Sequence, residues 1–347
     1  MFDAFGPFWG KYLEAISSGS IGFVLAMFPI FVLISVLWYF FAPTEANRTG
    51  NRTAKRAFQE AFPVEDFKIA CTKADIYNLF ILNLVGRPLR YLTLTIPGTI
   101  ISAVLFLEIF IYWFGEAPAL VTSPAAVIAL QLLMLIIASE LASYVYHILS
   151  HKVDFLWSFH RVHHSAEKLS FLAGTARNNP LDGWLTWPVE LPIKGLIMGA
   201  TLYVTNPVIH PAALGILVGL EFIFSLGGLL RHNRARISFG PLNYIFNAPA
   251  LHQIHHSMEL HHRDKNFGAN LSIFDWMFGT LYIPSKDESW RYGLNEEEVG
   301  ATNPHVRLRD YYLEPLYYAA ASLSKTFRGV GRLFRWNSRA VSPMSNK

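Results

Sequence analysis

Residues 119–151 read ALVTSPAAVIALQLLMLIIASELASYVYHILSH, an apolar run that ends in two histidines four positions apart. Its apolar part carries a single acid, Glu140, and as a helix it is long enough to cross a hydrocarbon layer of ~30 Å. On a helix that continues to the end of the run, His147 and His151 lie one above the other on one face. The stretch therefore predicts a membrane helix that delivers two imidazoles to one side of a bilayer.

The composition also indicates a protein that keeps much of its surface in lipid. Of the 347 residues, 52% are hydrophobic and 16% charged, whereas a soluble domain carries about a quarter charged residues. The net charge of +4 is too small to indicate a nucleic-acid partner. A single cysteine excludes an internal disulfide and a cysteine-based zinc site, so histidine is the plentiful transition-metal ligand.

The distribution of apolar runs predicts an all-α integral membrane fold with about four to five transmembrane helices. The runs cover residues 21–42, 92–114, 119–146, 184–205 and 207–230. The last two are separated by Thr-Asn-Pro, a turn signal, and are expected to form a helical hairpin.

Lysine and arginine are unevenly distributed over the connections between these runs. The connection after the first run holds eight of them, whereas residues 115–118 hold none. The positive-inside rule places the basic connection in the cytoplasm, and the crossings then bring residues 147–183 and 231–347 to the same face. We expect a multi-pass protein of a bacterial inner membrane, or of the endoplasmic reticulum in a eukaryote, with a cytoplasmic histidine-rich cap.

The chain is expected to divide into three parts. Residues 1–91 form an N-terminal membrane helix and a cytoplasmic amphipathic connection, and residues 92–283 form the membrane and histidine-bearing catalytic domain. Residues 284–347 form a basic cytoplasmic C-terminal tail without an acid after Glu314. Such a tail suits either an anionic membrane surface or plain solvation.

Ten of the 13 histidines fall into two short windows, where an even scatter would place about one. The first window contains HILSH at 147–151 and HRVHH at 160–164, and the second contains HQIHH at 252–256 and a further pair at 261–262. In HxxHH on a helix, the first and second histidines share a face and the third extends it, so one short helix can reach two metals. Imidazole suits iron, zinc, copper and nickel.

The two windows and the motifs around them resemble the fatty acid hydroxylase and sterol desaturase superfamily of membrane di-iron enzymes. Besides the histidine motifs, the similar features are RVHHS at 161–165, the isolated His232, GPL at 240–242, DKNFG at 264–268 and FGT at 278–280. The resemblance covers about residues 130–283. It is greatest for the alkylglycerol monooxygenase-like branch and its bacterial sterol-desaturase-like relatives.

The resemblance implies a set of metal ligands that is also the catalytic site: His147, His151, His160, His163, His164, His232, His252, His255 and His256. Groups that could orient these imidazoles are Asp154, Asp264, Asp275 and His262, although the acids could equally be solvated. His261 and His262 fall where relatives vary, and an exposed loop pair is the simpler interpretation. The chain departs from the family pattern at Phe274, which precedes Asp275, and at Asn179.

The resemblance also implies a cofactor and a reaction. Two iron ions would use O2 and electrons from a separate ferredoxin, cytochrome or reductase, and an overexpressed site of this kind can also take up zinc. The substrate would be a sterol, a fatty acyl chain or an ether lipid. Hydroxylation, desaturation and ether cleavage all remain open at this point.

Three other interpretations compete with a di-iron lipid oxygenase. A zinc hydrolase would be expected to carry HExxH or an adjacent carboxylate base, and no acid adjoins these motifs. A histidine-rich membrane metal transporter or metal-binding protein would place its ligands near the membrane midplane, whereas these motifs lie beyond the runs. A bis-histidine cytochrome would leave the HxxHH motifs unexplained.

Overall fold

The computed structural model describes residues 70–86, 89, 96–205, 236–295 and 303–339, with single positions between 206 and 235 that include Arg231 and His232. Within this part of the chain the fold consists of helices and loops, with two isolated β-bridges and no strand. The predicted membrane helix at 21–42 and most of the predicted span at 207–230 lie outside the described residues.

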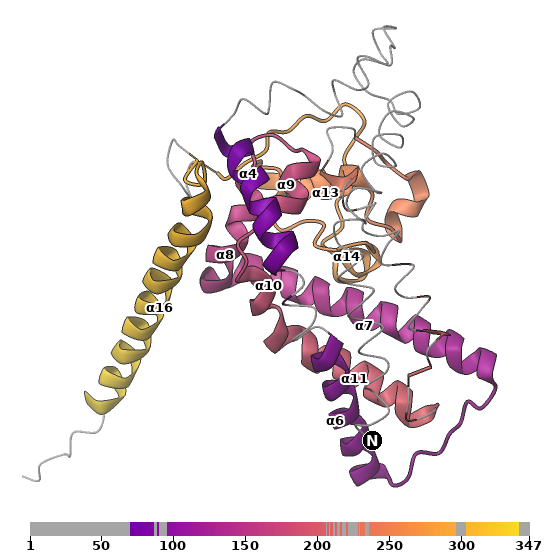
Figure 1. Cartoon of the computed structure of the whole chain (residues 1–347). Helices are drawn as coiled ribbons and strands as arrows, with labels where there is room; N and C mark the ends of the chain where they lie inside the picture. The colour runs from indigo at the N-terminus through magenta and orange to yellow at the C-terminus, as the bar shows by residue number, and fades with distance from the viewer. Residues whose placement is uncertain are drawn as a thin grey trace, which may run out of the picture.

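Three long helices form the apolar end of the molecule: α6 (Ile96–Phe114), α7 (Pro124–Lys152) and α11 (Trp187–Val204). They pack side by side, with α11 against both of the others (Figure 1). Two of them, α6 and α7, are long and apolar enough to cross a membrane, and in α6 only 11% of the apolar window is buried. Apolar side chains that face outward in this way are stable where lipid surrounds the helix.

Two glycines in α11 allow α6 to approach closely. A Cβ atom on Gly199 would lie 2.6 Å from the Cβ of Phe106 and 2.9 Å from the backbone nitrogen of Leu107. A Cβ atom on Gly195 would lie 2.0 Å from the Oγ of Ser102. The spacing of the two glycines matches the GxxxG pattern by which membrane helices pack when small residues let their backbones meet.

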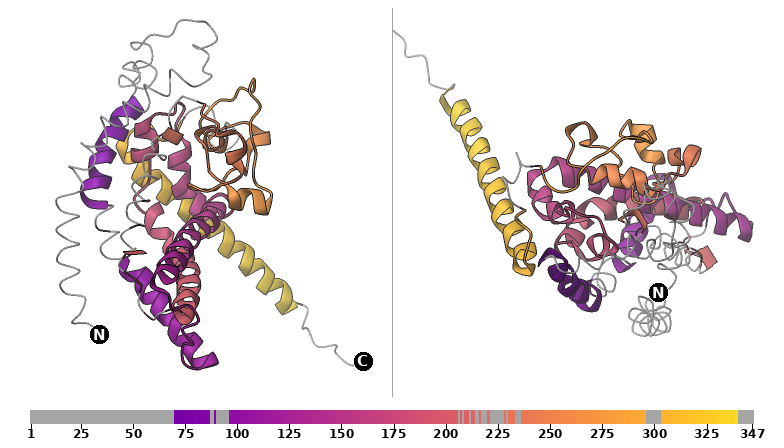
Figure 2. Two further views of the ribbon diagram at one scale, coloured as in Figure 1. Left: turned by 90° about the vertical axis from the view of Figure 1, so that its right-hand side faces the viewer. Right: turned by 90° about the horizontal axis from the view of Figure 1, so that it is seen from above.

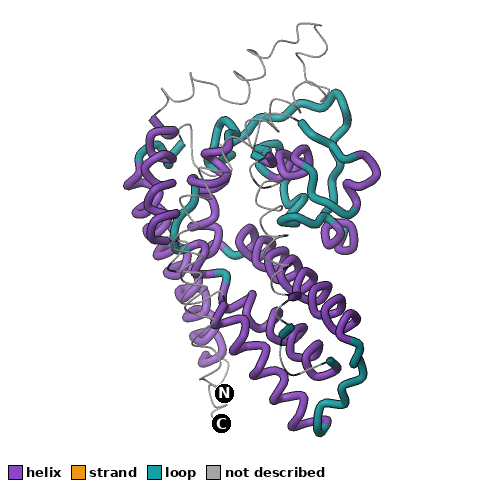
Figure 3. Tube along the Cα trace, turned by 45° about the vertical axis from the view of Figure 1, so that its right-hand side comes forward, coloured by secondary structure: helices purple, strands orange, loops and turns teal. Residues whose placement is uncertain are grey.

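Short helices and loops form a cap at the end of α7. In chain order they are α8 (Asp154–His164), α9 (Phe171–Ala176), α10 (Asp182–Leu185), η5 (Gly240–Tyr244), α13 (Pro249–His255), η6 (Leu260–His262) and α14 (Ile273–Phe278). Figure 3 shows the contrast between the long helices of the apolar end and the loop-rich cap. The expectation that the histidine motifs lie on helices is confirmed. Helix α7 carries HxxxH, α8 contains the first HxxHH, and α13 contains the second as far as His255, with His256 as its C-cap.

Two segments flank the cap on its outer side. The N-terminal one is α4 (Ala70–Ile81), continued by η3 (Leu82–Gly86), and the C-terminal one is α16 (Leu308–Arg339). Helix α4 packs on α9, and α16 packs on α8 and on α4, while the far end of α16 extends away from the other described helices (Figures 1 and 2). The division of the chain at residues 91 and 283 stays a prediction.

Substitution of Gly199 by alanine should separate α6 from α11, because the added methyl group would meet backbone atoms that cannot rotate away. We expect the free energy of unfolding to fall by about 1–3 kcal/mol, as for other overpacked contacts. Denaturant unfolding in detergent measures the change, with Leu196→Ala on the exposed face of α11 as the control. Equal stability of Gly199→Ala and the wild type would contradict this packing.

Candidate metal centre

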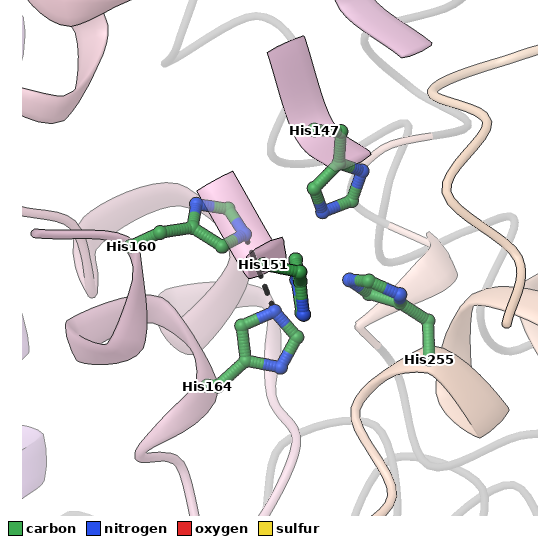
Figure 4. A group of neighbouring side chains, drawn as sticks. All are labelled: His147, His151, His160, His164 and His255. Atoms are coloured by element: carbon green, nitrogen blue, oxygen red, sulfur yellow. Dashed lines mark hydrogen bonds between the residues drawn. The ribbon is translucent and has the colours of Figure 1, made fainter. Parts of the chain in front are cut away.

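The nine histidines predicted as ligands come together in two neighbouring groups. In each group, one ring nitrogen of every member lies within 4.8 Å of the others. The first group, drawn in Figure 4, consists of His147, His151, His160, His164 and His255. The second group consists of His163, His232, His252 and His256. The imidazoles of His164 and His256 stack with ring centroids 4.5 Å apart, so the two groups adjoin.

Helical spacing explains how the members divide between the groups. On α8, His160 and His164 are one turn apart and join the first group, while His163 turns to the second. On α13 the division is reversed: His252 and its neighbour one turn on, His256, join the second group, and His255 joins the first. The prediction that one HxxHH helix can reach two centres therefore agrees with this geometry.

Backbone carbonyls fix the tautomer of two imidazoles in the first group. The Nδ1 of His147 lies 2.6 Å from the carbonyl oxygen of Phe267, and that of His255 lies 2.9 Å from the carbonyl oxygen of Lys265. Because a carbonyl oxygen can only accept, each Nδ1 carries the hydrogen and each Nε2 keeps its lone pair. Both Nε2 atoms, and that of His151, are buried without a hydrogen-bond partner.

The second group contains nitrogens that repel one another without a cation. The Nδ1 of His163 donates to the carbonyl oxygen of Arg177 at 3.3 Å, and that of His232 donates to the carbonyl oxygen of Gly228 at 3.2 Å. Their Nε2 atoms therefore both lack hydrogen, yet they lie 3.3 Å apart. A metal ion bound between these lone pairs would satisfy them, so the residues present fit a metal.

Burial keeps the cap imidazoles neutral. Desolvation, reinforced by the neighbouring imidazoles, lowers the pKa of His163, His164, His252 and His256 well below the usual 6.5. Burial lowers the pKa of His255 to about 3, although its hydrogen bond to Lys265 opposes the shift. Neutral imidazole is the form that binds a metal, so at pH 7 these side chains are ready to do so.

One carboxylate orients a ligand candidate directly. The Oδ2 of Asp182 accepts from the Nδ1 of His160 at 3.0 Å, and its Oδ1 accepts from the hydroxyl of Tyr146 at 2.5 Å. Burial opposes ionisation of Asp182, but His160 and Tyr146 outweigh it and hold its pKa below the usual range. Sequence reasoning missed Asp182, because it lies 18 residues beyond the HRVHH motif and adjoins no histidine.

The DKNFG motif, residues 264–268, supplies the two carbonyls of the first group. It follows an irregular path, with φ of 61° at Asp264 and 57° at Asn266. The carboxylate of Asp275 fixes the end of the motif by accepting from the backbone nitrogens of Phe267 at 2.7 Å and Gly268 at 2.8 Å. Asp275 therefore acts on His147 through the loop and not by touching the imidazole.

Glu140 anchors the same loop to α7. Its carboxylate accepts from the backbone nitrogens of Asn270 and Leu271, both at 3.0 Å, and from the Asn270 side chain at 2.6 Å. An acid inside an apolar helix is costly unless it is paired in this way. From the sequence, Glu140 was recognised only as the single acid in the apolar run, and its role in holding the loop was not predicted.

The remaining candidates lie apart from the imidazoles of the two groups. Asp154 has 75% of its side chain exposed and faces Lys325, and Asp264 pairs with Lys152. His261 is exposed, as the simpler interpretation held, but His262 is buried and donates from Nε2 to Glu288 at 2.7 Å. His261, His262 and Glu288 could hold a metal by distance alone, although their polar atoms already pair with one another.

A cavity of about 630 Å³ opens beside the first group. His151, His164 and His255 are among the residues that line it. Its walls come from α8, α16 and the loops near residues 257–264 and 293–295, and they carry both signs of charge. The charged residues that line it are Asp154, Arg161, Glu259, Arg263, Asp264 and Lys325.

Replacing Asp182 by asparagine should weaken metal binding in the first group about 10–100-fold, because the carboxylate no longer fixes the ring of His160. Competition between the protein and a chelator measures the dissociation constant. Asp154→Asn is the matched control, since it removes an exposed carboxylate from the first residue of the same helix, α8. Equal affinities of Asp182→Asn and Asp154→Asn would contradict the role of Asp182.

Part of the chain is similar to known proteins. Residues 132–280 match the family model described as fatty acid hydroxylase. The ornithine lipid hydroxylase OlsE of Rhizobium tropici is 32% identical over 167 residues, which are 48% of this chain and 46% of that protein. The alkylglycerol monooxygenases of Danio rerio and Homo sapiens are each 28% identical, over 52% and 44% of this chain and 34% and 30% of their own length.

The chain spans less than half the length of these curated relatives, and no solved structure matches it. The matched segment nevertheless includes all nine candidate ligands, from His147 to His256. It also includes the DKNFG loop and Asp275 that hold them. Residues 132–280 of the chain are therefore similar to the fatty acid hydroxylase family.

Proposed function

We propose that this chain is a membrane-bound, O2-dependent lipid monooxygenase with two iron ions, one in each histidine group. The observation that carries the proposal is the convergence of nine ring nitrogens, several of them buried and without hydrogen, into two adjoining groups. Buried polar atoms without partners are rare in folded proteins, and their clustering favours a bound cation.

The chemistry of the ligands and the names of the relatives favour iron over zinc. Among the described residues neither group includes a carboxylate or a thiolate, so the ligand set is wholly imidazole. Imidazole binds both metals, but zinc has no redox chemistry and catalytic zinc sites usually pair three ligands with an open position. The relatives are named as a hydroxylase and as monooxygenases, both of which are redox enzymes.

Some residues of the site would bind the metals, and others would orient the ligand imidazoles. The first group would hold one metal and the second group the other, while Asp182 and the carbonyls of Lys265 and Phe267 hold imidazoles in the required tautomer. The bound metals would activate O2 so that one oxygen atom enters a C–H bond and the other leaves as water, with two electrons from a donor and two protons.

The substrate we propose is a membrane lipid with a polar headgroup. The charged side chains in the walls of the cavity at the first group suit a polar headgroup better than a bare hydrocarbon, which would remove water from them without replacing its hydrogen bonds. The relatives are named for an ornithine lipid and for alkylglycerols, both of which carry polar groups. Their names also favour insertion of oxygen over desaturation.

The membrane arrangement follows from the same proposal. Helices α6 and α7 would cross the bilayer, with the cap on the cytoplasmic side of a bacterial inner membrane or of the endoplasmic reticulum. A separate ferredoxin, cytochrome or reductase would deliver electrons from that side. A histidine-rich transporter is less consistent with the cap, because the histidines gather at the end of α7 and not along a path through the membrane.

Purified protein from iron-fed cells should contain about two irons per chain, as in other two-metal sites. His255→Ala should lose the first-group metal and His163→Ala the second, and the double variant should lose both, because each histidine belongs to a different group. Elemental analysis with thermal unfolding of the metal-free proteins measures both quantities. Metal content unchanged in the folded double variant would contradict the proposal.

The activity is tested by supplying membrane lipids, a reductant and ¹⁸O2 to the iron-loaded protein. One ¹⁸O atom should appear in a hydroxylated polar lipid with the wild type and not with the double variant. Oxidation of free hydrocarbon in preference to polar lipids would contradict the substrate class.

A further inference from the structure

One short segment of the cap, residues 176–182, contacts a ligand candidate of each group. The carbonyl oxygen of Arg177 accepts from the Nδ1 of His163 in the second group at 3.3 Å. Five residues later, Asp182 accepts from the Nδ1 of His160 in the first group at 3.0 Å. A shift of this segment would therefore change the orientation of an imidazole in both groups.

Helix α4 holds the carbonyls on either side of the one that His163 uses. The side-chain nitrogen of Asn78 donates to the carbonyl oxygen of Ala176 at 2.6 Å and to that of Asn178 at 2.8 Å. Asn78 is fully buried, so no water competes for these bonds. With both flanking carbonyls fixed on Asn78, the path of the backbone at Arg177 is fixed as well.

The side chain of Arg177 ties the same segment to α4 from the other side. Arg177 is 1% exposed, and its guanidinium pairs with the carboxylate of Asp75 at 3.1 Å. It also donates to the backbone and side-chain oxygens of Ser165 at 3.3 and 3.2 Å and to the carbonyl oxygen of His305 at 3.4 Å. A buried guanidinium with several acceptors has little freedom to move.

Helix α16 completes the arrangement by contacting both α4 and the segment. The hydroxyl of Tyr311 donates to Asp75 at 2.5 Å, and that of Tyr312 donates to the side-chain oxygen of Asn78 at 2.7 Å. The carbonyl oxygen of Tyr311 accepts from the side chain of Asn179 at 2.5 Å. Asn179, where this chain departs from the family pattern, is thus the point at which α16 meets the segment.

We propose that Asp75, Asn78, Tyr311 and Tyr312 form a clamp that positions residues 176–182 and thereby sets the metal affinity of both histidine groups. The inference rests on the proposed function, because it assumes that the groups bind metal. Both helices of the clamp lie outside residues 132–280, the part that matches the family model. Segments that the family motifs do not include would therefore complete the metal centre of this chain.

Two variants of clamp residues and one control variant test the clamp in the full-length protein. Asn78→Asp keeps the shape of the side chain but removes both donors, and Tyr312→Phe removes only the hydroxyl that holds Asn78. Tyr317→Phe is the matched control, because Tyr317 lies on the same helix with 76% of its surface exposed. Each protein is titrated with Co²⁺ against a chelator, and the visible absorption of bound Co²⁺ reports the ligand geometry.

The clamp predicts that Asn78→Asp weakens Co²⁺ binding about 10–100-fold, the usual effect of losing a group that orients a ligand. Tyr312→Phe should weaken it less and shift the Co²⁺ absorption in the same direction, while Tyr317→Phe matches the wild type. Thermal unfolding of the metal-free proteins separates these effects from a loss of stability, and Tyr312→Phe decides the matter if Asn78→Asp does not fold.

Lowered stability with wild-type Co²⁺ affinity and absorption in Asn78→Asp or Tyr312→Phe would overturn the clamp and leave a purely structural network. In that case the proposed function would stand, because the wild type would still bind two metals. If the wild type itself bound no Co²⁺ or iron, the proposed function would fail and the clamp with it.

Discussion

The hydrogen that five of the nine imidazoles donate from Nδ1 to a fixed acceptor is the interaction on which the centre depends. A neutral imidazole offers one donor and one acceptor, so fixing the donor fixes where the lone pair points. Carbonyls of Arg177, Gly228, Lys265 and Phe267, and the carboxylate of Asp182, take these hydrogens. The unprotonated Nε2 atoms are then left facing one another, which is stable only around a cation.

These acceptors are themselves held by parts of the chain that are distant in sequence. Glu140, within α7, fixes the loop after the DKNFG motif, and Asp275 fixes the motif itself. On the opposite side, Asn78 and Arg177 fix the carbonyl that His163 uses. The cap therefore needs the membrane helix α7 on one side and the flanking helices α4 and α16 on the other.

Helical periodicity predicted which histidines of each motif share a face, because spacing on a helix converts directly into direction, whereas the full set of nine ligands, His232 included, followed from the family resemblance. Sequence patterns did not predict Asp182, and they selected Asp154, which stands close to a histidine motif in sequence but is exposed in the structure. Every residue has a backbone carbonyl, so the sequence does not show which carbonyls accept hydrogen bonds from the imidazoles. The acceptor roles of Arg177, Lys265 and Phe267 could be found only from the fold. His262 was a candidate only because it is a histidine near the second window, whereas in the structure its side chain is hydrogen-bonded to Glu288.

Diffraction from crystals of the iron-loaded protein at the iron absorption edge is the measurement that bears most directly on the two-group centre. We predict two anomalous peaks, one among the ring nitrogens of the first group and one among those of the second. A single peak shared by both groups, or a peak confined to His261, His262 and Glu288, would contradict the account.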